Sequence, residues 1–183
     1  MRNSTPHPIF TEDRTGQFLV EALVALGILV VGLLGILTLL TRSFALGRIV
    51  SDNNTATYLA AEGIEIVKNL IDANVIQGQS WLGGFTDGDF EVEYDVQVPA
   101  GVGQGGALVP YQDRFLTFDS ATNLYGYTGF DTTKFKRLVR IELIPSGVVV
   151  DEVKVNSIIS WTSGGGSFSV DLEDRFLNWR PTP

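Results

Sequence analysis

The side chains that could do chemistry in this chain of 183 residues are mainly carboxylates. The chain has 21 Asp and Glu residues, a single histidine (His7) and no cysteine. This composition excludes thiol catalysis, disulfides, a histidine-based catalytic triad and zinc sites with several histidines. The formal net charge of −8 disfavours a nucleic-acid-binding protein, which normally presents a basic surface. We therefore expect no enzyme, no cofactor and no nucleic-acid partner.

One of these carboxylates, Glu21, stands directly before a long apolar run. Residues 22–41 read ALVALGILVVGLLGILTLLT and contain no charge. At about 1.5 Å per residue, a helix of this length crosses the ~30 Å hydrocarbon core of a bilayer. The run is longer than the apolar part of a secretory signal peptide and no small-residue cleavage site follows it, so we expect it to stay in the mature protein. An acid inside such a segment marks a functional site by default, and the alternative is that Glu21 lies at the headgroup level.

The residues around Glu21 form the most specific pattern in the sequence. A polar leader ends at Gly16, Gln17 follows, and Glu21 is the fifth residue after the glycine. This pattern resembles the N-terminus of type IV prepilins and type II secretion pseudopilins. Two features depart from the usual family pattern: Gln17 stands where Phe is most common, and the leader contains Glu12 and Asp13 beside its arginines.

The resemblance implies a set of roles for these residues. A prepilin peptidase would cut between Gly16 and Gln17 and methylate the new amine of Gln17. Glu21 would pair with the N-terminal amine of a neighbouring subunit and set the register of the filament. An α-amino group has a pKa of about 8 and is mostly cationic at pH 7, so cleavage would create the cation that Glu21 needs. The implied partners are the peptidase, other pilin or pseudopilin subunits and the lipids of the cytoplasmic membrane, with the C-terminal domain outside that membrane.

The apolar run is predicted to continue as an amphipathic helix. No proline interrupts residues 9–98, and apolar residues recur at helical spacing over 59–75. We expect one helix to about Asn74, with Glu65 and Lys68 as an i,i+3 ion pair on its wet face. The predicted division is a leader at 1–16, a transmembrane and filament-core helix at 17–42, its amphipathic continuation at 43–76 and an antiparallel β domain at 77–183.

Alternation and turn residues predict the β domain. Residues 90–98 alternate apolar and polar side chains, which indicates a half-buried strand whose three acids face water. Residues 99–113 are rich in glycine and read as a long loop. Further strands are predicted at 114–118, 124–127, 135–144, 148–161 and 167–172. The expected fold class is α+β, a long N-terminal helix packed on an antiparallel sheet, which the prepilin resemblance also implies.

Three other groups of residues have weaker functional interpretations. Two acidic groups offer oxygen ligands that suit Ca²⁺, but turns and solvated strand faces explain them and we assign no metal site: Asp87 with Asp89, and Asp171 with Glu173 and Asp174. The basic run Lys134, Lys136, Arg137 and Arg140 is interpreted as the exposed side of a strand, with a patch for acidic neighbours or DNA as the alternative. The aromatic group Tyr125, Tyr127 and Phe130 is interpreted as core, with a ligand surface as the alternative.

We therefore expect a structural subunit, a minor pilin or pseudopilin of a type IV pilus or of a type II secretion-like filament. The alternative is a single-pass membrane protein that keeps residues 1–16. That protein would use its β domain outside the cytoplasm as a sensor or adhesin, with no filament role.

Overall fold

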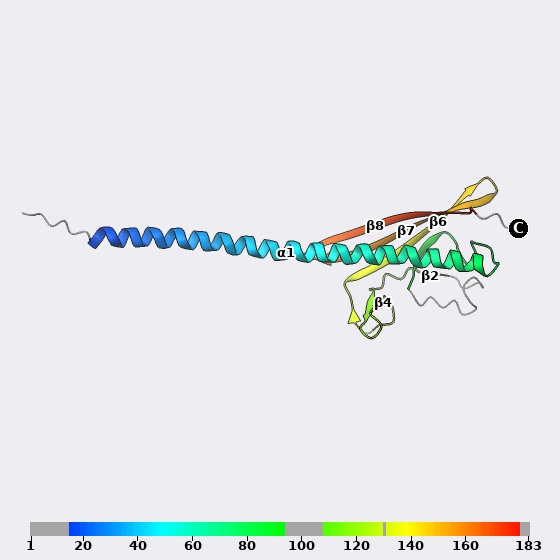
Figure 1. Cartoon of the computed structure of the whole chain (residues 1–183), viewed down its shortest axis with the longest axis horizontal. Coiled ribbons are helices and arrows are strands. Elements are labelled where there is room, and N and C mark those ends of the chain that lie inside the picture. Colours follow the sequence, from blue (N-terminus) through cyan, green and yellow to red (C-terminus); the bar gives the residue numbers. More distant parts are fainter. Residues whose placement is uncertain (1–14, 94–107, 130, 180–183) are drawn as a thin grey trace, which may run out of the picture. The chain divides into compact units, whose positions relative to one another are not determined.

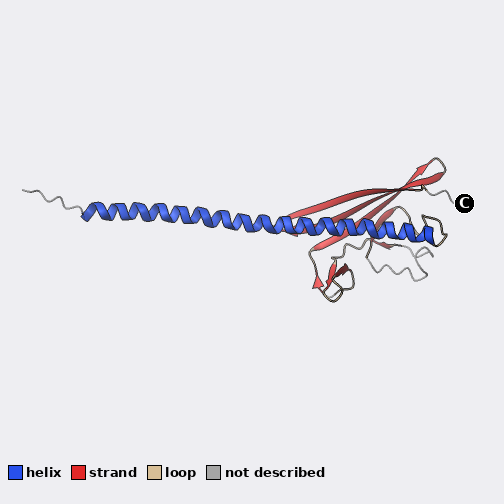
Figure 2. Ribbon diagram, viewed as in Figure 1, coloured by secondary structure: helices blue, strands red, loops and turns tan. Residues whose placement is uncertain are grey.

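The protein has an α+β fold, seen in a computed structural model that describes residues 15–93, 108–129 and 131–179 (Figures 1 and 2). One helix, α1 (Thr15–Ile76), precedes all the described strands. A five-stranded antiparallel sheet has the order β2-β1-β6-β7-β8, with β1 at Gly88–Glu91, β2 at Val109–Pro110, β6 at Phe135–Ser146, β7 at Val149–Ser163 and β8 at Gly166–Leu177. A small three-stranded antiparallel sheet has the order β4-β3-β5, with β3 at Thr117–Asp119, β4 at Leu124–Gly126 and β5 at Asp131–Thr132. The chain divides into two compact units, Met1–Gly47 and Arg48–Pro183.

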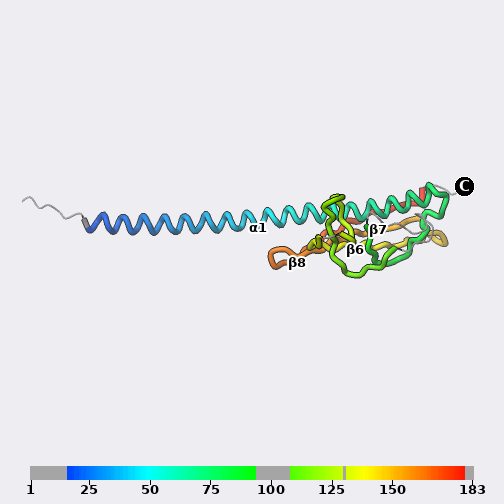
Figure 3. The backbone as a smooth tube through the Cα atoms, turned by 90° about the horizontal axis from the view of Figure 1, so that it is seen from below, coloured from blue at the N-terminus to red at the C-terminus, as the bar shows by residue number. Residues whose placement is uncertain are grey.

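Within the second unit, the C-terminal half of α1 packs on one face of the five-stranded sheet. Figure 3 shows this part of the helix and the strands as two layers. The apolar stripe of the helix supplies Ala56, Leu59, Ala60, Val67, Leu70 and Ile71, which are all buried. The central strands β6 and β7 meet this stripe with Val139, Ile141, Val153, Val155 and Ile159. The amphipathic pattern predicted for this half of the helix therefore builds the core of the domain.

The helix ends at Ile76, two residues beyond the expected Asn74, and a glycine cap follows it. Gly78 has a φ of 69°, a left-handed conformation that glycine adopts without the steric cost of a side chain. The N–H of Gln79 donates to the carbonyl of Asn74, and the N–H of Gly78 donates to that of Val75, which is the Schellman arrangement. The buried Asn74 side chain then donates to the carbonyls of Trp81 (3.3 Å) and Gly83 (2.9 Å). The chain that leaves the helix is thus held against its last turn.

The long strands follow the alternation in the sequence. Over residues 135–141 of β6 and 153–161 of β7, every second side chain is buried, while those between them are exposed or half-buried. Gly164 and Gly165 join β7 to β8 and both have positive φ, as a two-residue hairpin turn requires. The β6–β7 hairpin and the strand after it are therefore confirmed, although β8 runs to Leu177, further than expected.

The first predicted strand differs most from expectation. β1 covers only Gly88–Glu91, and residues 94–98 of the predicted strand lie outside the described residues. The loop predicted at 99–113 contains the short strand β2, which pairs with β1. Residues 99–107 of this loop lie outside the described part. The sequence pattern could not predict β2, because a strand of two residues is too short to show an alternation.

A glycine allows α1 to approach the sheet closely. Gly63 is buried in the helix, and a methyl group at its Cα would overlap the Ser157 hydroxyl and lie 3.2 Å from Arg137 Cδ. Glycine in the middle of a helix usually destabilises it. Its presence at residue 63 is explained by this contact between the helix backbone and β7.

We expect Gly63→Ala to lower the free energy of unfolding of the domain by about 1–3 kcal/mol, the usual cost of overpacking a core. The measurement is chemical denaturation of the full chain in detergent micelles, followed by tryptophan fluorescence. Gly47→Ala is the matched control, because nothing lies within 4 Å of the methyl group it adds, and we expect no loss of stability there. Adding Ser157→Ala to Gly63→Ala should recover most of the loss, and a Gly63→Ala variant as stable as the wild type would contradict the close contact.

Candidate functional site

The N-terminal half of α1 is an apolar helix that no other part of the described chain covers. Every residue from Gly16 to Arg48 is exposed, and the first buried residue of the helix is Ala56. The large apolar side chains between Phe18 and Val50, except the partly buried Ile49, expose 44–71% of their surface. Within the described residues, α1 is the one helix long and apolar enough to cross a membrane, and none of its apolar segment is buried. A soluble monomer rarely leaves so large an apolar surface in contact with water.

The few polar groups of the apolar run are satisfied by the helix itself. The Thr38 hydroxyl donates to the carbonyl of Leu34 at 2.8 Å, and the Thr41 hydroxyl donates to that of Leu37 at 3.0 Å. The backbone is satisfied within the helix. Residues 22–41 therefore present no unpaired polar group to an apolar surrounding, which is the condition for a segment that lies in lipid or among other apolar helices.

The predicted site residues lie at the start of the same helix. Gly16 and Gln17 fall in its first turn, and Glu21 follows one turn after Gln17. All three are exposed. The first four N–H groups of a helix have no acceptor within it, and the Gly16–Gln17 peptide bond lies in this first turn of the described helix. At i,i+4 spacing, Gln17 and Glu21 share one face of the helix.

Comparison of the chain with protein-family models, with curated proteins and with solved structures gives no match.

A buried arginine, Arg137, joins the helix to the sheet, although the sequence predicted that it would be exposed. Arg137 of β6 has no accessible surface. Its guanidinium donates to the carbonyl of Val92 at 2.6 Å and to that of Leu59 at 3.3 Å, and lies 3.4 Å from the carboxylate of Glu62. The interpretation of Arg137 as part of an exposed basic face is wrong. Its place in the alternation, two residues after the buried Phe135, was the signal for burial.

Glu91 is a second correction. The acids of the first strand were expected to face water, yet Glu91 is 2% exposed. Its carboxylate accepts two hydrogen bonds from the Arg114 guanidinium, at 2.8 and 2.5 Å, and one from the N–H of Gln112 at 3.1 Å. The Arg114 guanidinium also lies 4.6 Å above the ring of Tyr127, and burial raises the pKa of the Tyr127 phenol to about 12. Alternation alone missed this pair because the segment before β3 folds over the acid.

The other members of the basic run each have an acidic partner. Lys134 pairs with Asp52 of α1 at 2.5 Å and Lys136 with Asp113 at 2.7 Å, while Arg140 makes a bidentate pair with Asp89. The hydrogen bonds from Lys136 and from Arg140 hold the pKa of Asp113 and of Asp89 below the usual range. Burial is the largest single influence on Asp52 and raises its pKa, but the hydrogen bonds from Lys134 and Ser163 and the charges of Lys134 and Arg48 together outweigh it, so the pKa of Asp52 is lowered as well.

The acidic residues with a possible role in calcium binding each accept a hydrogen bond from a different group of the chain. Asp87 accepts from the N–H of Leu143, Asp171 from the Asn156 amide, and Glu173 from Arg175. Among the residues that the structure describes, no three carboxylate or imidazole groups are placed to hold a metal ion.

The aromatic group lies against the second core cluster. Tyr125 and Tyr127 are partly buried against Leu116 and its neighbours, so the interpretation of these two as core is confirmed. Phe130 lies outside the described residues.

We expect Arg137→Met to cost about 3–5 kcal/mol of stability, because it leaves two carbonyls unpaired in the interior and removes the cation beside the partly exposed Glu62. Arg140→Met, which breaks an exposed pair on the same strand, should cost about 1 kcal/mol or less. Urea denaturation of the full chain in micelles measures both. Replacing Arg137 and Glu62 together by Met should restore part of the loss, and equal effects of the two arginine substitutions would contradict the structural role of Arg137.

Proposed function

We propose that this protein is a prepilin-like subunit, a minor pilin or pseudopilin of a type IV pilus or of a type II secretion-like filament. The observation that carries the proposal is the division of α1. Its second half is packed on the sheet, whereas its first half exposes an apolar surface long enough to cross a bilayer. A helix of this kind is suited first to lipid and then to a bundle of identical helices, since both surroundings are apolar.

Under this proposal, the subunit waits in the cytoplasmic membrane with its β domain outside. A prepilin peptidase removes residues 1–16 by cutting in the first turn of α1, between Gly16 and Gln17, and methylates Gln17. The helix then leaves the lipid and enters the core of the filament. Gly27, Gly32 and Gly35 have no neighbour within 4 Å of an added methyl group, so they leave room for the close approach of another helix.

Glu21 would supply the charge that orders the subunits. Its carboxylate has no cation beside it within the apolar run, and a charge in an apolar bundle is costly unless it is paired. Cleavage would place an amine one turn away on the same helix, a rise of about 6 Å, and a second amine on the adjacent subunit. Pairing with the neighbour fixes how far one helix slides along another, because only one axial offset brings the two charges together.

Removal of residues 1–16 is the first prediction of this proposal. Intact-mass measurement after expression with a prepilin peptidase should give a chain that starts at Gln17 and carries a methyl group. Substitution of Gly16 by a bulky residue should leave the leader in place. A full-length chain in the presence of active peptidase would support the alternative, a permanent single-pass anchor for a sensor or adhesin domain. An N-terminal Gln17 that has cyclised without methylation would remove the amine that the pairing requires.

The second prediction concerns Glu21. We expect Glu21→Gln to leave membrane insertion and cleavage intact but to lower filament incorporation at least about tenfold, because a charge pair in an apolar bundle is lost. The measurement is the fraction of subunit in sheared filaments relative to the membrane fraction. Glu65→Gln is the matched control, since Glu65 forms only an exposed pair with Lys68 at 3.7 Å. Normal incorporation of the Glu21 variant would contradict the register role.

A further inference from the structure

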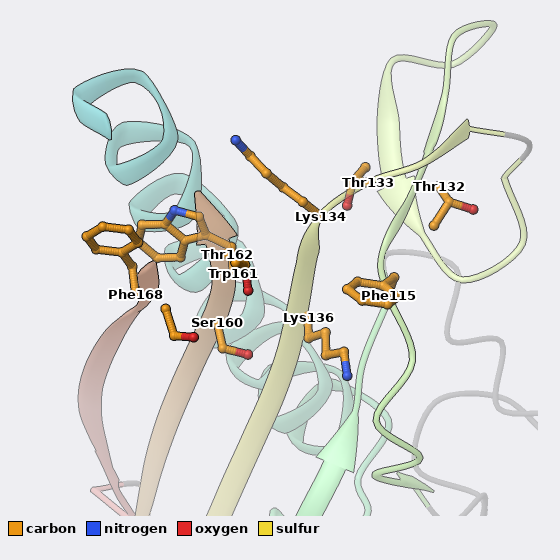
Figure 4. Close-up of a pocket in the computed structure, with 10 residues that line it drawn as sticks. Phe115, Thr132, Thr133, Lys134, Lys136, Ser160, Trp161, Thr162 and Phe168 are labelled. Carbon is orange, nitrogen blue, oxygen red and sulfur yellow. The ribbon is translucent and has the colours of Figure 1, made fainter. Parts of the chain in front are cut away.

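A hollow lined by apolar surface and by several hydroxyl groups opens on the β domain, at the end of the five-stranded sheet where β7 turns into β8. Its volume is about 470 Å³, within the usual size range of small-molecule sites. Figure 4 shows its lining: strands β6 and β7 form one side, and Phe115 and Thr132 belong to the other. None of the functional roles proposed above uses this hollow.

The walls of the hollow are rich in hydroxyl groups. Ser160, Thr162 and Ser167 lie on the paired strands β7 and β8, and Thr132 ends the short strand β5. Each hydroxyl both donates and accepts a hydrogen bond. Such a lining matches a ligand that itself carries several hydroxyls, because each partner can adjust its proton to the other.

An aromatic ring and an ammonium group stand together on one side. Phe115 is 47% exposed, and Lys136 Nζ lies 4.7 Å from the centroid of its ring. An exposed aromatic ring offers an apolar plane on which the C–H face of a pyranose ring can rest. The pair therefore combines a flat apolar contact with a nearby positive charge.

The charge of the hollow suits one carboxylate better than a phosphate. Lys134 and Lys136 both belong to the lining, but each already contacts an acid, Asp52 and Asp113 respectively. The Lys134 side chain extends away from Lys136 and Phe115 (Figure 4) and pairs with Asp52 of α1, so it does not serve the hollow. The Lys136 ammonium has three donors and can take a further acceptor beside Asp113. Asp113 leaves little net positive charge there, and a dianionic phosphate would be repelled where a monoanion is tolerated.

A buried donor without an acceptor lines the same hollow. Trp161 is 4% exposed, and its indole Nε1 has no hydrogen-bond partner in the structure. Buried polar groups are rarely left unpaired. The indole lies on the face of β7 that packs on α1, opposite the Ser160 and Thr162 hydroxyls, so it does not contribute a contact to the proposed ligand.

From these observations, we propose that the hollow binds a sugar acid, a pyranose that carries a carboxylate. The carboxylate would lie at Lys136, the sugar ring on Phe115, and the ring hydroxyls against Ser160 and Thr162. This site does not depend on filament assembly, since all of its residues lie in the second compact unit.

The test uses the full-length protein in detergent micelles, titrated with glucuronate and followed by calorimetry and tryptophan fluorescence. We expect saturable binding with a dissociation constant of about 1 mM or lower, typical of a ligand of this size. Lys136→Gln should weaken binding at least about tenfold, as should Thr162→Tyr, which fills the hollow without removing a charge. The matched control is Lys154→Gln. Lys154 of β7 does not line the hollow and pairs with Glu142 of β6, so this change should leave the affinity unchanged.

Neutral and non-sugar probes decide the ligand class. Glucose should bind at least about tenfold more weakly than glucuronate, and acetate and inorganic phosphate should not compete at equal concentration. Equal binding of glucose would overturn the role of the carboxylate, and equal binding of acetate would overturn the role of the sugar ring. The absence of saturable binding, or binding that survives Thr162→Tyr in a variant with an unchanged melting temperature, would overturn the site itself.

Discussion

The constraint on which the structure depends is that apolar surface must be removed from water, and α1 meets it in two different ways. From Ala56 onward, the helix buries its apolar stripe on the sheet. Over residues 22–41 the helix is apolar on all sides, and nothing in the described chain covers it. Burial of apolar area contributes about 25 cal/mol per Å², so a surface of this size favours an apolar surrounding such as a membrane.

The second half of the helix is fixed to the sheet by close contact as well as by apolar burial. Gly63 brings the helix backbone against Ser157, and Arg137 spans the gap beside them to reach the carbonyls of Leu59 and Val92. Apolar packing alone tolerates sliding of a helix along a sheet, because it has no direction. A buried guanidinium with defined acceptors does not tolerate it, since any shift would leave charge and carbonyls unpaired. These contacts therefore set the position of the helix in the domain.

Periodicity predicted the elements whose length lets a pattern repeat. The single helix and the strands β6 and β7 follow from spacing alone, and the helix ends only two residues beyond the expected Asn74. The alternation in β6 also predicts burial of Arg137, because it shares a face of the strand with Phe135 and Val139. Its charge nevertheless favoured the interpretation that it is exposed. The burial of Glu91 could not be predicted, because its partner Arg114 is 23 residues away. The hollow between β6 and Phe115 is likewise formed by segments that only the folded chain brings together.

Under the proposed function, the site of cleavage is far along the chain from the core of the domain. All the buried residues of the described chain lie at Ala56 or beyond, about 40 residues after the Gly16–Gln17 peptide bond. What cleavage changes is charge and not packing, since it would replace a peptide bond at Gln17 by a cationic amine one turn from Glu21. If the proposed function is correct, the change that prepares the subunit for a filament would therefore be confined to the first turns of an exposed helix.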